Sequence, residues 1–122
     1  MPHTDTAFRQ SADFFARSLR SLRDAGLVRL DDVEAAALAA AVDGVVADSI
    51  ELFGSRTDTA RRGGDIDVLI LTSAPRLETA RRVSSRFFMH CEERIDVVVV
   101  DPGRLTPAEE AFLQSLRRVR IT

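Results

Sequence analysis

The sequence predicts a mixed α/β (α+β) fold, a small mixed β-sheet with helices packed on it, and three observations support this. Residues 49–53, 65–71 and 95–100 are short runs rich in β-branched and other apolar residues, a composition typical of strands. The runs are almost continuously apolar, so helices must cover both faces of the sheet. Segments with helical patterns precede, separate and follow them, which gives the order α-α-β-β-α-β-α.

The size and charge of the chain limit its class. It has 122 residues, the length of one domain with one core, and a net charge of −2. This charge gives no reason to expect nucleic-acid binding. The single cysteine, Cys91, excludes an intramolecular disulfide and fits a reducing cytosol. No run approaches the roughly 18 apolar residues of a membrane span, so we expect a cytoplasmic domain without a membrane partner.

The first predicted helix covers residues 6–25, within an N-terminal helical extension of residues 1–30. An apolar residue recurs at every third or fourth position: Phe8, Ala12, Phe15, Leu19 and Leu22. Gly26 is a suitable C-terminal stop. Two interpretations stay open. The stripe packs on the core of its own chain, or it docks on a second subunit and forms a homo-oligomer, because this spacing also suits a two-helix seam.

The second predicted helix begins after Asp31. Asp31 can act as its N-cap, and Glu34, three residues later, completes a capping box. Residues 35–42 are rich in alanine, which has the highest helix propensity. We expect this helix to end near Gly44.

Two further helices are predicted around the third apolar run. Residues 76–91 are polar and rich in arginine, which favours a helix with one wet face. Thr106, Pro107 and Glu109 have the spacing of an N-cap, a proline at the first helical position and a capping-box glutamate. This pattern predicts a last helix that continues to about Arg118.

Three aspartates stand at the front of two predicted strands. Side chains alternate between the faces of a strand, so Asp65 and Asp67 point to the same side, and Asp96 lies on another strand. If the two strands pair in the right register, three carboxylates converge and repel each other. A hard cation such as Mg²⁺ would relieve the repulsion while leaving positions for substrate phosphates. The alternative is a set of solvated strand-end aspartates without a shared site.

A Gly-Ser turn precedes these aspartates. Gly54 follows a predicted strand directly, where glycine lets the backbone approach a ligand closely. The Ser55 hydroxyl and the free N–H groups of the turn can hold phosphate oxygens. Arg56, Arg61 and Arg62 flank the turn and could neutralise phosphate charge, the alternative being a solvated loop.

These residues carry a family resemblance. The segment ELFGSRTDTARRGGDIDVLIL, followed later by RIDVVVVD, resembles the nucleotidyltransferase superfamily that includes DNA polymerase β. More narrowly it is similar to the minimal nucleotidyltransferases, and residues 31–122 would form that domain. The resemblance implies that Asp65 and Asp67 hold metal ions and that Asp96 completes a second metal site and helps to deprotonate the acceptor. It assigns the nucleotide phosphates to the turn: Gly54, Ser55 and Arg56.

The implied activity is transfer of a nucleoside monophosphate, AMP from ATP, to a hydroxyl group. The implied cofactor is Mg²⁺, as two ions, with Mn²⁺ as a substitute. The implied partner is a small helical HEPN-type protein, since some such pairs act as toxin and antitoxin and the enzyme adenylylates a tyrosine. Two alternatives stay open: a catalytically silent module that acts by partner binding, and a small RNA or antibiotic nucleotidyltransferase. The acidic pI and the missing acceptor-binding domain count against the second.

Overall fold

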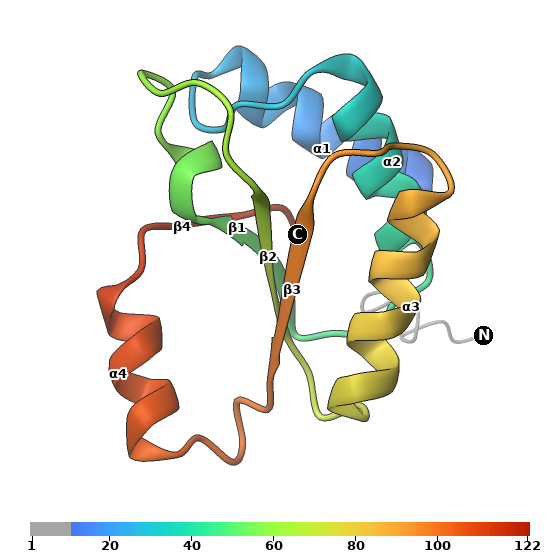
Figure 1. The fold of residues 1–122 in the computed structure, drawn as a ribbon. Helices are drawn as coiled ribbons and strands as arrows, with labels where there is room; N and C mark the ends of the chain where they lie inside the picture. Colours follow the sequence, from blue (N-terminus) through green and yellow to red (C-terminus); the bar gives the residue numbers. More distant parts are fainter. Residues whose placement is uncertain (1–10) are drawn as a thin grey trace, which may run out of the picture.

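The computed structural model describes residues 11–122, so the predictions for residues 6–10, Phe8 among them, lie outside the described part. The described residues form four α-helices, four strands and one short 3₁₀ turn, η2 (Figure 1). Their order along the chain is α1 Ala12–Asp24, α2 Asp32–Val42, β1 Ser49–Phe53, η2 Gly54–Thr57, β2 Ile66–Leu71, α3 Arg76–Phe88, β3 Ile95–Val100, α4 Pro107–Ser115 and β4 Arg118–Arg120.

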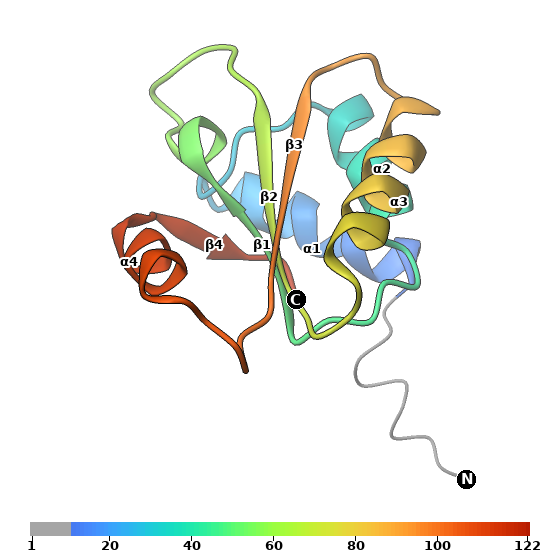
Figure 2. The same ribbon diagram turned by 60° about the horizontal axis from the view of Figure 1, so that its bottom comes forward.

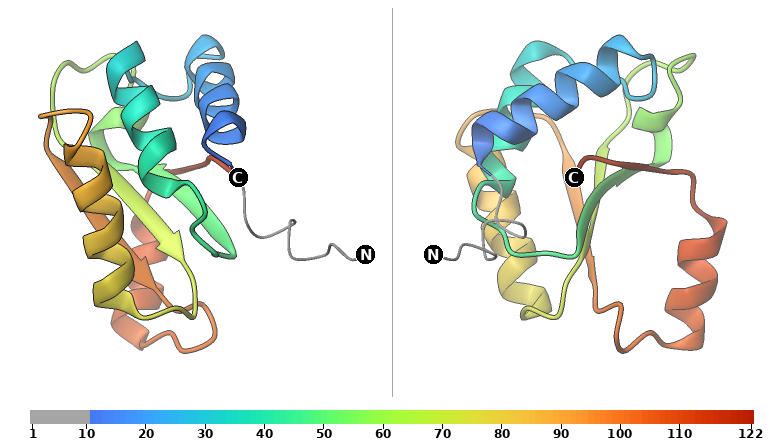
Figure 3. Two further views of the ribbon diagram at one scale, coloured as in Figure 1. Left: turned by 90° about the vertical axis from the view of Figure 1, so that its right-hand side faces the viewer. Right: turned by 180° about the vertical axis from the view of Figure 1, so that it is seen from behind.

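The four strands form one mixed sheet in the order β3-β2-β1-β4. β2 and β3 run parallel, whereas β1 runs antiparallel to both of its neighbours. Helices α1, α2 and α3 cover one face, and α4 lies on the other (Figures 1 and 3). The structure therefore confirms the mixed α+β class and the helices on both sides of the sheet.

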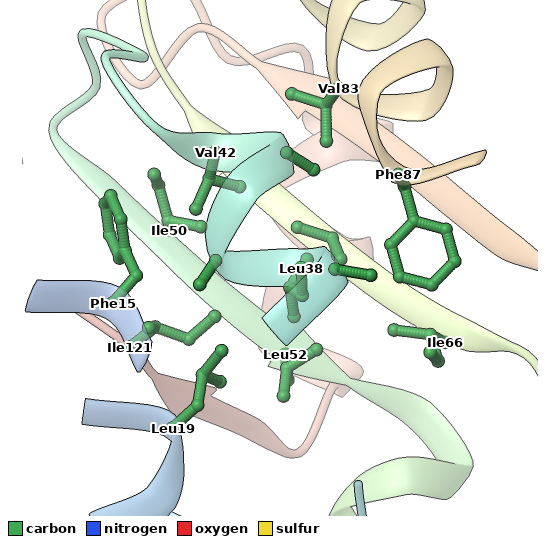
Figure 4. Packing of buried hydrophobic residues seen from close by; sticks show 14 of the residues in the cluster. Phe15, Leu19, Leu38, Val42, Ile50, Leu52, Ile66, Val83, Phe87 and Ile121 are labelled. Atoms are coloured by element: carbon green, nitrogen blue, oxygen red, sulfur yellow. The ribbon is translucent and has the colours of Figure 1, made fainter. Parts of the chain in front are cut away.

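The main core lies between the sheet and helices α1, α2 and α3 (Figure 4). Phe15 and Leu19 of α1 are fully buried there beside Leu38 of α2 and Ile50 of β1. The stripe of α1 is thus used inside its own chain, which favours the first of the two interpretations. Although α1 belongs to the predicted extension, it packs into the same core as the rest of the described chain.

The predicted starts of α2 and α4 match the local capping signals, whereas α1 begins at Ala12, with Ser11 as its N-cap, later than the predicted start at residue 6. Asp31 caps α2, and Glu34 completes the capping box. Thr106 and Glu109 form the second capping box at the start of α4, with Pro107 in its first turn. Gly26, just after α1, has a φ of +75°, a left-handed conformation that glycine adopts without strain.

The predicted extent of the last helix is wrong. Helix α4 ends at Ser115, and Arg118 begins strand β4, which pairs antiparallel with β1. Val119 and Ile121 pack against the main core, whereas Arg118 and Arg120, which alternate with them along the chain, are exposed. This period of two is the pattern of a strand, and the Ile121 N–H continues the pairing by donating to the Ile50 carbonyl at 2.8 Å. None of the helices described in residues 11–122 is long and apolar enough to cross a membrane.

Candidate active site

The parallel pairing of β2 with β3 brings two of the aspartates together. Asp67 and Asp96 are direct partners across the two strands. Both lie on the face opposite helices α1–α3, because the alternating residues Ile66 and Val68 are buried in the main core. Asp65 lies two positions before Asp67, just ahead of β2. Figure 2 shows the starts of β2 and β3 side by side at one end of the sheet.

The three carboxylates interact electrostatically. Burial raises the pKa of Asp67, and the nearby charges of Asp96 and Asp65 raise this pKa further. Within residues 11–122, none of the three forms an ion pair with a basic side chain. The sheet therefore gathers negative charge at this end without supplying a neutralising partner.

The donor set suits a hard cation, although it is not drawn together as a finished ligand shell. As the side chains stand in residues 11–122, no three His, Cys, Asp or Glu groups are close enough to hold a metal ion. Asp65 and Asp96 are exposed, so their carboxylates are free to rotate, whereas Asp67 is half-buried. Carboxylate oxygens are the ligands that Mg²⁺ prefers. To share a cation, the three side chains would have to turn toward one another.

The Gly-Ser turn lies directly against Asp67. Strand β1 ends at Phe53, which pairs with Asp67 across the sheet, and η2 begins at Gly54. Gly54 has a φ of +75°, and a Cβ added there would lie 2.3 Å from Asp67 Oδ2. The backbone conformation favours glycine, and a larger residue would also displace the Asp67 carboxylate. The turn therefore meets the carboxylate cluster at the position where the sequence predicted a shared site.

A second close approach fixes the end of the loop that links η2 to β2. Gly64 has a φ of +87°, and a Cβ there would lie 2.4 Å from Ser55 Oγ. The Ser55 hydroxyl thus packs against the backbone one residue before Asp65. No role was predicted for Gly64, although the Gly63-Gly64 pair directly ahead of the first aspartate is a signal that the sequence contains.

The structure gives Arg56 a different place from the one expected. Its side chain is buried, with 4% of the residue surface exposed. It donates two hydrogen bonds to the Glu34 carboxylate, at 2.9 and 2.8 Å. It also donates to the carbonyls of Arg29 at 3.0 Å and Gly64 at 3.1 Å. These contacts occupy its three guanidinium nitrogens inside the protein, so Arg56 is not brought to the site as a phosphate ligand.

The other charged side chains of the loop differ in their contacts, because the arginines are exposed and Asp58 accepts a hydrogen bond from the backbone. Arg61 and Arg62 are exposed near the turn and stay available to a bound anion. The Asp58 carboxylate instead accepts the Ala60 N–H at 3.1 Å. Arg94, just before β3, is also exposed. These three exposed arginines are the basic residues that lie closest in sequence to the three aspartates.

Comparison with models of known protein families and with curated proteins found no match.

Proposed function

We propose that the protein is a metal-dependent nucleotidyltransferase with the fold of that superfamily, and that it transfers AMP from ATP to a hydroxyl group. One observation carries the proposal. Asp67 and Asp96 are register partners on adjacent strands, and Asp67 contacts the Gly54 turn. A carboxylate pair beside a glycine turn can bind a cation and the phosphates that the cation accompanies.

Asp65, Asp67 and Asp96 are the residues that would hold Mg²⁺, as one or two ions, or Mn²⁺ in its place. Their unpaired charges and the raised pKa of Asp67 fit a cation-binding role. When bound, the metal supplies Lewis-acid activation of the phosphoryl oxygens and of the attacking hydroxyl.

The side chains of this chain supply binding and proton transfer. The Ser55 hydroxyl and the turn N–H groups orient phosphate oxygens, and the exposed Arg61 and Arg62 add positive charge. Asp96 is exposed at the start of β3, where its carboxylate can accept the proton of an acceptor hydroxyl. Attack of the acceptor oxygen on the α-phosphorus forms the new P–O bond and releases pyrophosphate.

The acceptor is proposed to lie on another macromolecule. Asp65 and Asp96 are exposed at the end of the sheet, so a bulky acceptor can reach them. A helical HEPN-type protein is the proposed partner on the family resemblance alone. A homo-oligomer through α1 is less favoured, because Phe15 and Leu19 are already buried in the core.

Calorimetric titration with ATP and Mg²⁺ tests nucleotide binding. We expect binding by the native protein and its loss in the Asp65→Ala/Asp67→Ala double variant, with circular dichroism to confirm that the variant is folded. Absence of binding by the native protein would refute the proposal. Incubation with labelled ATP and candidate protein, RNA and aminoglycoside acceptors then identifies the acceptor class. Label on RNA and not on protein would favour the small RNA nucleotidyltransferase instead.

A further inference from the structure

The buried ion pair between Glu34 and Arg56 joins helix α2 to the turn that carries Ser55. The guanidinium and the carboxylate form two hydrogen bonds, and 4% of Arg56 and 6% of Glu34 are exposed. Glu34 Oε1 also accepts the Asp31 N–H at 2.9 Å, so the capping box orients the carboxylate. The partner of Arg56 is thus held rigidly at the start of a helix.

The same guanidinium reaches the other end of the loop. Arg56 Nε donates to the Gly64 carbonyl at 3.1 Å, one residue before Asp65. The connection between α1 and α2 reinforces both ends, because the Arg29 N–H donates to the Arg56 carbonyl at 2.8 Å and its guanidinium donates to the Gly63 carbonyl at 2.6 Å. Hydrogen bonds made by Arg29 and Arg56 therefore hold the beginning of the loop, at Arg56, to its end, at Gly63 and Gly64.

We propose that Glu34 and Arg56 form a positioning latch, which holds Ser55 of the phosphate turn beside Asp65 of the aspartate cluster. A buried ion pair is a poor device for stability alone, because desolvation offsets most of its attraction and apolar residues of similar size can replace it. The planar guanidinium can, however, satisfy a carboxylate and two carbonyls at once, which fixes three segments relative to one another. An effect of the latch on nucleotide affinity rests on the function proposed above. The effect of the latch on the loop does not depend on that function.

Amide hydrogen exchange in the Glu34→Met/Arg56→Met variant tests the latch. Methionine fills similar volume without charge, so the variant is expected to keep its global stability. We expect exchange at least ten-fold faster in residues 54–65 and unchanged exchange in the core strands β1 and β2. A general stabilising role would instead accelerate exchange in those strands as well.

Two further variants distinguish the bidentate geometry of Arg56 from its charge, and the loss of this ion pair from the loss of any ion pair at the start of α2. Arg56→Lys keeps the positive charge but loses the bidentate fork, and we expect intermediate exchange. Arg23→Met is the matched control, because it removes an exposed ion pair with Asp32 at the same end of α2 without touching the loop. We expect native exchange in this control. If the double variant fails to fold, Arg56→Lys gives the comparison, because it keeps the buried charge paired with Glu34.

Nucleotide binding supplies the second measurement. In calorimetry with ATP and Mg²⁺, we expect the latch variants to bind at least ten-fold more weakly than the native protein and the Arg23→Met control. Native exchange in residues 54–65 of the double variant would overturn the latch. Faster exchange with native ATP affinity would overturn its positioning role. A native protein that does not bind ATP would refute the proposed function, and the exchange data would still decide the latch.

Discussion

Replacing Gly54 by alanine perturbs the contact on which the candidate site depends. Gly54 combines a φ of +75° with a close approach to the Asp67 carboxylate. Gly26, after α1, has the same φ of +75°, but nothing lies within 4 Å of an added Cβ. The pair Gly54→Ala and Gly26→Ala therefore separates the cost of the contact from the cost of the backbone conformation.

The expected magnitudes follow from these geometries. A left-handed conformation costs an alanine about 1–2 kcal/mol at either position. The reduced freedom of the unfolded chain affects both variants alike and cancels in their difference. At Gly54 the new Cβ would lie 2.3 Å from Oδ2 and 3.3 Å from Cγ of Asp67, so the carboxylate must leave its rotamer at a cost of about 1 kcal/mol. We expect Gly54→Ala to lower the free energy of unfolding by about 2–3 kcal/mol and Gly26→Ala by about 1–2 kcal/mol.

Urea denaturation of both variants measures this difference, and titration with Mn²⁺ measures its effect on the site. We expect Gly54→Ala to lose cation affinity, because the displaced Asp67 carboxylate can no longer act as a ligand, and Gly26→Ala to keep it. Equal losses of unfolding free energy together with native Mn²⁺ affinity in both variants would refute the reasoning. That result would mean that Gly54 serves the turn alone and has no part in placing Asp67.

Three other substitutions test separate parts of the structure. Glu34→Gln leaves the buried Arg56 charge without its partner, and urea denaturation should show a loss of about 3 kcal/mol at neutral pH. Burial opposes ionisation of Glu34, but its hydrogen bonds from Arg56 and Asp31 outweigh burial and lower its pKa, so this loss should shrink as the pH falls through that lowered pKa. Asp67→Asn should raise the free energy of unfolding of the metal-free protein at neutral pH. Because the folded-state pKa of Asp67 is raised, this gain should vanish below the unfolded-state pKa, and a gain that persists in acid would contradict the electrostatic explanation. Ile121→Ala should cost about 3 kcal/mol if β4 completes the core, and a loss well under 1 kcal/mol would show that it does not.

The parts of the fold that the sequence predicted are those with local signals. The capping boxes at Asp31 and Thr106 each require residues three positions apart, so their geometry can be read from the sequence. Strand β4 has only three residues and depends on hydrogen bonds with β1, which lies far away in the chain. A short segment after an amphipathic helix carries too little local preference to mark the boundary, and Arg118 was therefore assigned to the helix.

The same difference between local signals and contacts of distant segments decides which features of the candidate site could be predicted. The sequence placed Asp67 and Asp96 near the starts of two apolar runs but left their register open, because a run that is apolar on both faces does not specify how it aligns with its neighbour; the structure makes the two aspartates direct partners. The position of Arg56 depends on Glu34, which lies 22 residues away in the sequence. An arginine beside a phosphate turn and an arginine buried under it look alike in one sequence. Only the tertiary partner decides between them.

The face of the sheet that carries α4 holds acidic residues in two different environments. Glu51, on β1, is buried on the same face as Asp67, accepts a hydrogen bond from Ser49 and lies 3.4 Å from Arg118. Asp67 is half-buried too, yet it faces two further carboxylates and, within residues 11–122, has no basic partner. The fold thus places an arginine where a carboxylate serves structure and leaves the aspartates uncompensated. Local conflicts of this kind are expected at functional sites, because the missing charge is supplied by what binds there.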